Sequence, residues 1–155
     1  MRFDLEIKGD STATARMEEL SNRAVNLSPV LTAAGEIMKK GLAKQFDSKG
    51  AYLGGKGTPW PKLAKATVER KVRQGFNPDI LRANGELEES LRGGSGHVFR
   101  VAKTQVRTGT KDYRARFHQG GTIKGEPARK LVGLSTRDRE KIFSLVRKHM
   151  TIQAK

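Results

Sequence analysis

The stretch SPVLTAAGEIMKKGLAKQF, residues 28–46, decides the fold that we expect for this chain. Ser28 followed by Pro29 makes a good helix start, with the serine as cap and the proline in the first turn. The apolar residues that follow recur every three to four positions and so share one helical face; they are Val30, Leu31, Ala34, Ile37, Met38, Leu42 and Phe46. We expect this stripe to form one wall of the core rather than a surface reserved for a partner, because few other segments could supply that wall.

Two further elements are expected before this helix. Residues 3–8, FDLEIK, alternate apolar and charged side chains, which is the period of a strand with one buried face. Gly9 and Asp10 end that strand. A helical stretch should follow from about Ala13 to Ala24.

Glycine and proline crowd the residues that follow the long helix, which makes a regular element implausible there. They are Gly50, Gly54, Gly55, Gly57, Pro59 and Pro61. We therefore expect an extended loop at about residues 48–61, within a single domain that spans residues 1–155. Loops of this length are often functional.

The second half of the chain predicts short elements and one longer helix. A short helix is expected from about residue 64 to 73, and a short apolar element at residues 87–91, ended by a pair of glycines. Residues 98–101, 104–108 and 113–118 have the mixed pattern of antiparallel strands. Ser135 opens the last helix, with Asp138 three residues later, much as in a capping box. The predicted fold class is α+β, with a small antiparallel sheet packed against the long helix and the C-terminal helix.

The charge of the chain is strongly basic and unevenly distributed. The formal net charge is +15, of which residues 1–91 carry +3 and residues 92–155 carry +12. Such a field repels identical chains unless an acidic partner, nucleic acid or counterions lie nearby. The basic half is therefore interpreted as a surface for DNA or for an acidic protein ring, with a merely solubilising face as the alternative. Hydrophobic residues make up only 35% of the chain, so the core must be modest and burial is expected to be completed in an assembly.

Several kinds of protein are disfavoured by what the sequence lacks. The chain has no cysteine, which excludes disulfides, zinc–thiolate sites and thiol nucleophiles. No stretch approaches the roughly 20 apolar residues of a membrane span, so no membrane partner is expected. Residues 1–7 lack the apolar run of a signal peptide, and we expect the protein to be made and used inside the cell.

No motif in the chain predicts catalysis. Residues 50–57, GAYLGGKG, match a P-loop only as far as Lys56, because Gly57 stands where a serine or threonine would hold magnesium. His97, His118 and His149 lack the spacing of two ligands on one helical face, and no carboxylate cluster completes a site. We therefore expect no enzyme activity, no cofactor and no metal.

Trp60 stands between two prolines in the glycine-rich loop. Such a residue can pin the loop to the core of its own chain. It can equally anchor a neighbouring subunit, since tryptophan is enriched among interface hot spots. The sequence leaves both interpretations open.

An ordered series of short motifs runs through the middle of the chain. Its members are Gly57, Trp60-Pro61, Leu63, Thr67, Lys71, Ile80-Leu81, Asn84-Gly85-Glu86-Leu87, Ser90-Leu91, Val106, Gly109, Tyr113, His118-Gln119-Gly120-Gly121, Pro127-Ala128-Arg129 and Leu134. The series resembles the phage virion morphogenesis family, the tail-completion proteins of Mu-like and related contractile-tailed phages. The chain departs from that pattern at Asn84, where a threonine is usual, and at Arg114 and Arg116, where the family is usually apolar and small.

The resemblance implies a structural protein of the tail terminus or head–tail junction, placed in the tail or neck of the virion after assembly in the host cytoplasm. Such proteins commonly form rings, most often sixfold at a tail end, and a ring needs a heterologous interface that closes on itself. The implied partners are copies of this chain, proteins of the tail tube, sheath or neck, and, as a further candidate, DNA phosphates in the channel. The loop at 48–61 would reach a neighbouring subunit. The subunit or partner interface is predicted at Trp60, Leu63, Tyr113, Arg116, His118 and Arg129.

The alternative function is a basic nucleic-acid-binding module, with the basic half as its electrostatic footprint. Tyr113 and Phe117 do not form the stacking pair of an RNA-recognition motif, so only phosphate contact is supported. A steep salt dependence of DNA affinity in a monomer would mark this alternative. An enzyme such as a nuclease is the third candidate, and it lacks a metal site or an acid–base pair.

Overall fold

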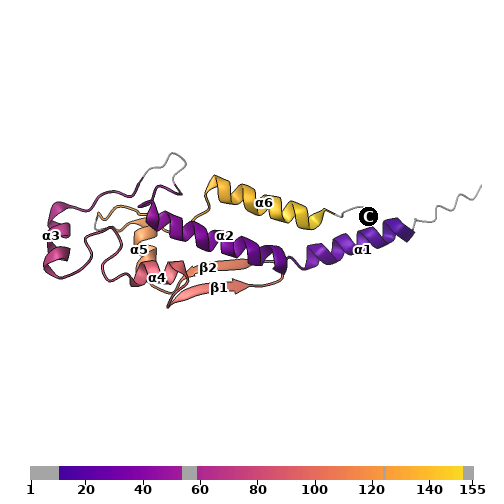
Figure 1. The fold of residues 1–155 in the computed structure, drawn as a ribbon, viewed down its shortest axis with the longest axis horizontal. Coiled ribbons are helices and arrows are strands. Elements are labelled where there is room, and N and C mark those ends of the chain that lie inside the picture. The colour runs from indigo at the N-terminus through magenta and orange to yellow at the C-terminus, as the bar shows by residue number, and fades with distance from the viewer. Residues whose placement is uncertain (1–10, 54–58, 124, 152–155) are drawn as a thin grey trace, which may run out of the picture.

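The structure is a computed structural model that describes residues 11–53, 59–123 and 125–151. Figure 1 shows an elongated molecule in which the long helix α2 is the central rod. The elements, in chain order, are α1 (Ser11–Val25), α2 (Ser28–Asp47), α3 (Lys65–Arg73), α4 (Glu86–Arg92), β1 (His97–Val101), β2 (Val106–Thr110), α5 (Arg114–Gly120) and α6 (Thr136–Met150). The predicted α+β class is therefore confirmed.

Strands β1 and β2 form an antiparallel hairpin that packs on one side of α2, while α6 lies along the other side (Figure 1). The hairpin approaches α2 closely at Gly35, where a Cβ atom would lie 2.6 Å from the Phe99 ring and 2.9 Å from Val106. Glycine at this position therefore allows the sheet to rest directly on the backbone of the helix. Phe99 pairs with Thr108 in the register of the hairpin.

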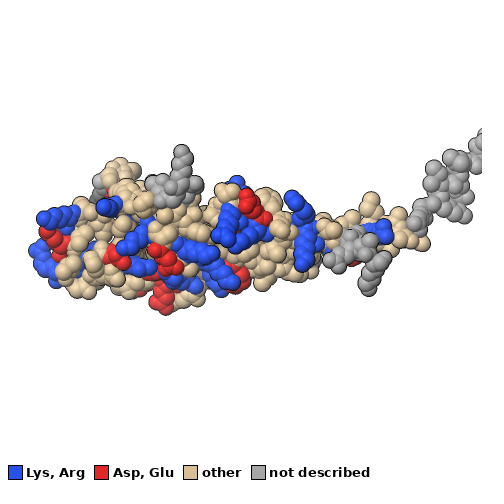
Figure 2. Space-filling model, turned by 45° about the horizontal axis from the view of Figure 1, so that its top comes forward, with Lys and Arg blue, Asp and Glu red and all other residues tan. Residues whose placement is uncertain are grey.

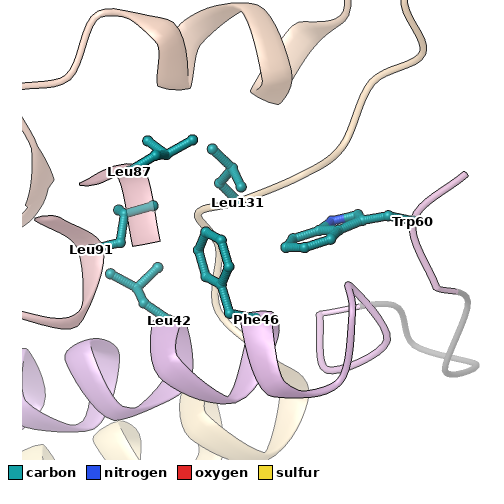
Figure 3. Close-up of a cluster of buried hydrophobic side chains, with 6 residues drawn as sticks. All are labelled: Leu42, Phe46, Trp60, Leu87, Leu91 and Leu131. Atoms are coloured by element: carbon teal, nitrogen blue, oxygen red, sulfur yellow. The ribbon is translucent and has the colours of Figure 1, made fainter. Parts of the chain in front are cut away.

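The main core lies at the C-terminal end of α2 (Figure 3). Phe46 meets the Trp60 ring edge to face, with ring centroids 5.3 Å apart. The buried cluster consists of Leu42, Phe46, Trp60, Leu87, Leu91 and Leu131. Residues from α2, α4 and two extended segments thus share one core.

Helix α6 is fixed to α2 through its N-terminal turn. Ser135 caps it, because the serine Oγ accepts a hydrogen bond from the Asp138 N–H at 3.1 Å. The Asp138 side chain is 3% exposed and its carboxylate accepts from the Tyr52 hydroxyl at 2.8 Å. Burial raises the pKa of Tyr52, and the hydrogen bond to Asp138 raises it further, so the phenol stays a donor at neutral pH. Gly41 leaves room for this contact, since a Cβ there would lie 3.0 Å from the Asp138 carboxylate.

Helix α1 continues roughly along the line of α2 and projects beyond the body of the molecule (Figure 1). It has no buried residue. Its C-terminal turn is tied to the end of α6, because the Arg23 guanidinium donates to the carbonyl oxygens of His149 at 2.9 Å and Thr151 at 3.0 Å. The rest of α1 extends away from that attachment.

Most of the elements that the sequence predicts are confirmed. The helices at 13–24, 28–46, 64–73 and 135–150 and the strand at 98–101 are found, with ends within a few residues, and the second strand begins two residues later than predicted. Leu27, not Ser28, stands at the cap position of α2, and Ser28 is its first residue. No described helix is long and apolar enough to cross a membrane.

The predicted strand at residues 113–118 is wrong, since this segment is helix α5. Asp112 starts the helix by accepting a hydrogen bond from the Arg114 N–H at 2.9 Å, an aspartate turn that competes with extended backbone. Two predictions fall outside the described residues: the strand at 3–8 and, at 54–58, the centre of the predicted loop.

Candidate functional site

An extended segment, residues 128–132, in which Arg129 and Leu131 are buried, organises the end of the molecule that carries α3, α4 and α5. The Lys130 carbonyl accepts from the side chains of Gln45, at 2.8 Å, and Trp60, at 3.0 Å. Gln119 holds the next residues, because its Oε1 accepts from the Leu131 N–H at 2.7 Å and the Val132 N–H at 3.0 Å, and its Nε2 donates to the Val132 carbonyl at 2.9 Å. Three distant parts of the chain therefore converge on one short segment.

A tight turn at Gly121 brings that segment back beneath α5. Gly121 has a φ of +77°, and a Cβ atom there would lie 2.9 Å from the Glu126 carbonyl oxygen, so only glycine fits. The Arg129 N–H then donates to the His118 carbonyl at 2.6 Å. The motif at 118–121 is thus explained by backbone geometry.

An open cleft of about 540 Å³ lies between α3, α4, α5 and this segment. Its apolar lining comes from Leu63, Ile80, Leu81 and Leu87. The basic residues that line it are Lys62, Arg70, Lys71, Arg114, His118 and Arg129, whereas Glu126 is the one acidic residue among the described lining residues. The cleft therefore combines an apolar floor with a positive rim.

Several of the rim charges have no acidic partner. In the part of the chain that the structure describes, no carboxylate lies within 4.0 Å of the charged groups of Lys62, Arg70 or Arg129. Arg129 is only 7% exposed and its Nε donates to the Pro61 carbonyl at 3.3 Å. By contrast, Arg114 is neutralised by Asp112 at 2.6 Å and Glu86 at 2.8 Å. The net field in the cleft is positive.

Two titratable groups of the cleft have lowered pKa values. Burial lowers the pKa of Lys71, whose ammonium donates to the Asp79 carbonyl oxygen. Burial also lowers the pKa of His118; the Arg129 charge adds to this effect and the Glu126 carboxylate opposes it. His118 is therefore largely neutral at pH 7, and the positive charge of the cleft comes from its lysines and arginines.

The six predicted interface residues divide into three groups. Leu63, His118 and Arg129 line the cleft. Tyr113, at the N-cap of α5, and Arg116, on α5, lie outside it: Tyr113 is 68% exposed, and the Arg116 guanidinium stacks over the Phe117 ring at 4.7 Å. The remaining residue is in the core of its own chain.

That residue is Trp60, which is 6% exposed. A Cβ atom on Gly50 would lie 2.4 Å from its indole, so the two loop ends around residues 50 and 60 pack tightly together. The first of the two interpretations, a pin for the loop, therefore describes its place in the chain.

The sequence prediction missed the basic residues Lys62 and Arg70. Both are next to motif positions, one beside Leu63 and the other three residues after Thr67. Residues one helical turn apart share a face, so the position of Arg70 relative to Thr67 was a usable signal. Among the described residues no group of three or more histidines and carboxylates could hold a metal ion. The cationic rim and apolar floor of the cleft suit an anionic, partly apolar ligand.

Comparison with known proteins gives one match. The model of the phage virion morphogenesis family matches residues 10–151, which is nearly the whole chain and includes every residue of the cleft. No curated protein and no solved structure matches. Because the family model covers so much of the sequence, the chain belongs to the phage virion morphogenesis family.

Proposed function

We propose that this protein is a structural component of the phage tail terminus or head–tail junction, and that it assembles as a ring that completes the tail or joins it to the head. Membership of the family supports a role in virion assembly. A structural role suits a cleft that offers cations and apolar side chains to a partner. In this proposal the protein resides in the tail or neck of the virion.

The observation that carries the proposal is the apolar face of α1. Ala13, Met17, Leu20 and Ala24 are spaced by three and four residues and share one face of the helix. The groove between α1 and α6 is lined instead by residues such as Glu19, and Met17 is 70% exposed. Ala13 and Ala24 are also exposed and Leu20 is half-buried, so most of this apolar face is left open by the chain's own body.

A second copy of this chain is the occupant that we propose for this face. A helix of 15 residues is marginal in water without tertiary packing, so α1 should gain stability when its apolar face is covered. Phe143 on α6, 62% exposed, adds apolar surface on the helix that α1 contacts. Repeated around a closed ring, such a contact covers every α1.

The basic half is proposed to face an acidic tail component or the DNA path. Figure 2 shows one face of the molecule, on which lysine and arginine side chains spread along much of the length and outnumber the acidic ones. On the hairpin, Arg100 and Arg107 are exposed and directly opposite each other. Like charges in this arrangement destabilise a hairpin, and an anionic partner would remove that cost.

The experiment compares assembly of the wild type with two variants of α1. Light scattering should give a closed oligomer of about six copies for the wild type, since a heterologous interface that closes yields one defined size. Met17→Glu places a charge in the apolar face and should shift the protein to monomer. Asn22→Glu makes the same charge change on an exposed residue off that face and should leave the oligomer intact.

The same variants should be supplied to a phage that lacks this gene. Wild type and Asn22→Glu should restore tails that are joined to heads in electron micrographs, whereas Met17→Glu should not. A wild type that stays monomeric over the whole concentration range, together with full rescue by Met17→Glu, would overturn the proposal.

A further inference from the structure

We propose that residues 1–10 of one copy bind in the cleft of the next copy, so that the copies join head to tail. The inference builds on the proposed ring and names the two surfaces that would close it.

The side chains that line the cleft are complementary to a ligand that is both acidic and apolar. Lys62 and Arg70 are exposed at its rim, and no carboxylate among the described residues lies within 4.0 Å of their charged groups. Ile80 and Leu81 are only half-buried in its floor. A purely ionic ligand would leave the apolar side chains of the floor exposed to water. A purely apolar ligand would leave the charges of the rim without a partner.

Residues 3–7, FDLEI, have that composition. Phe3, Leu5 and Ile7 alternate with Asp4 and Glu6, so an extended chain presents apolar side chains to one surface and carboxylates to the other. A cleft of about 540 Å³ falls in the range that holds a few side chains of this kind. Floor and rim thus match the two faces of one short segment.

The charge distribution along the chain also favours a contact between the N-terminal stretch of one copy and the body of the next. Residues 1–25 hold four bases and five acids, a net charge of −1, whereas residues 26–155 hold 27 bases and 11 acids, a net charge of +16. Two copies of so basic a body repel each other. The part of the chain best suited to approach a neighbour's body is therefore the stretch from residue 1 to 25.

A chain cannot fill its own cleft in this way. Helices α1 and α2 have 15 and 20 residues, so end to end they span about 52 Å at about 1.5 Å per residue. They run on in nearly one line, and the cleft lies beyond the C-terminal end of α2 (Figure 1). Ten extended residues reach at most about 36 Å. The segment that leads into α1 must therefore bind a different copy.

The segment at residues 1–10 and the cleft are different surfaces of the chain, so the contact between two copies is heterologous. Heterologous contacts are the kind that can close into rings. The test uses two charge-reversed full-length proteins. The first, Asp4→Lys with Glu6→Lys, alters the segment; the second, Lys62→Glu with Arg70→Glu, alters the cleft. Each alone should be monomeric by light scattering.

The decisive sample is an equimolar mixture of the two. In the mixture the normal segment of the second protein meets the normal cleft of the first, and the reversed segment meets the reversed cleft. Both contacts then pair opposite charges, so the mixture should regain the oligomer that neither protein forms alone. All four substitutions in one chain should restore the oligomer. As a matched control, Arg139→Glu with Lys141→Glu reverses two exposed charges of α6 and should assemble like the wild type.

A peptide of residues 1–12 tests the contact without any ring. Labelled peptide should bind the segment-reversed protein, whose cleft is free, and bind at least tenfold more weakly to the monomeric Lys62→Glu/Arg70→Glu protein. If the wild type assembles but both double variants assemble equally well, the inference is wrong and the ring survives. If the wild type forms open head-to-tail chains of no fixed size and the peptide binds in the cleft, the inference holds and the ring fails. Peptide binding that ignores the cleft substitutions overturns the inference in either case.

Discussion

Gln119 shows how single residues shape the end of the molecule that carries the cleft. Its side-chain amide satisfies the N–H groups of Leu131 and Val132 and the carbonyl of Val132. Leu131 is fully buried, so water is not at hand to replace these bonds. A buried backbone group that loses its partner costs on the order of 1–3 kcal/mol.

We therefore expect Gln119→Leu to lower the free energy of unfolding by about 1–3 kcal/mol, because the N–H of the fully buried Leu131 loses its partner. Urea denaturation measures this. Gln105→Leu, at an exposed glutamine in the hairpin turn, should change the free energy by no more than about 0.5 kcal/mol. Equal effects of the two substitutions would mean that the amide of Gln119 does not hold the segment.

The sequence placed Trp60 and Gln119 in a motif, but it did not reveal which backbone groups their side chains hydrogen-bond. Trp60 was equally suited to the core and to a partner, because both need a large apolar side chain in a loop. Its donation to the Lys130 carbonyl depends on how residues 60 and 130 meet in space, which no local pattern encodes. Lys62 and Arg70 were missed for the same reason: they come from a different segment than Arg129, the rim residue that was predicted.

At the scale of elements, the contact between the hairpin and α2 depends on one glycine. Gly35→Ala should gain about 0.5–1 kcal/mol of helix propensity. It also drives a methyl group to 2.6 Å from the Phe99 ring, and overpacking of this kind costs typically about 1–3 kcal/mol. The steric cost outweighs the gain, so we expect a lower melting temperature.

The matched control for this prediction is Gly109→Ala in β2, where a Cβ atom would meet nothing within 4 Å. That substitution should leave the melting temperature unchanged or slightly raised. A rise for both variants would show that the hairpin does not rest on Gly35.

Elements with a strong local pattern were predictable, and α5 was not. The stripe of α2 and the cap of α6 are signals within one segment, and both are found in the structure. Residues 113–118 mix polar and apolar side chains without a clear period, so a strand was as consistent with the sequence as a helix. The hydrogen bond from the Arg114 N–H to Asp112 tipped the balance toward the helix.

At the scale of the whole molecule, the exposed position of α1 separates assembly from folding. Helix α1 has no buried residue, so its amide hydrogens should exchange rapidly in the monomer, whereas those of α2, which crosses the core, should exchange slowly. In the oligomer, protection of α1 should rise while that of α2 stays high. Hydrogen exchange of the wild type and Met17→Glu compares the two states. Protection of α1 that is the same in both would show that assembly leaves α1 uncovered.

The charge asymmetry of the whole chain was evident from the sequence, but its elongated shape was not. Shape follows from how α1 continues the line of α2 and where α6 ends, and these are set by contacts such as that of Arg23 with the C-terminal end of α6. The distance between α1 and the cleft, on which the head-to-tail contact depends, therefore had to come from the structure.

The burial of Trp60 also has a spectroscopic consequence. It is the chain's only tryptophan, and its indole is packed against Phe46 in the core rather than on α1 or in the cleft lining. Its emission therefore reports the integrity of that core and is insensitive to whether neighbouring copies are attached. One sample can then be followed by fluorescence for unfolding and by scattered light for size, and any condition that changes the second signal alone acts on the contacts between copies.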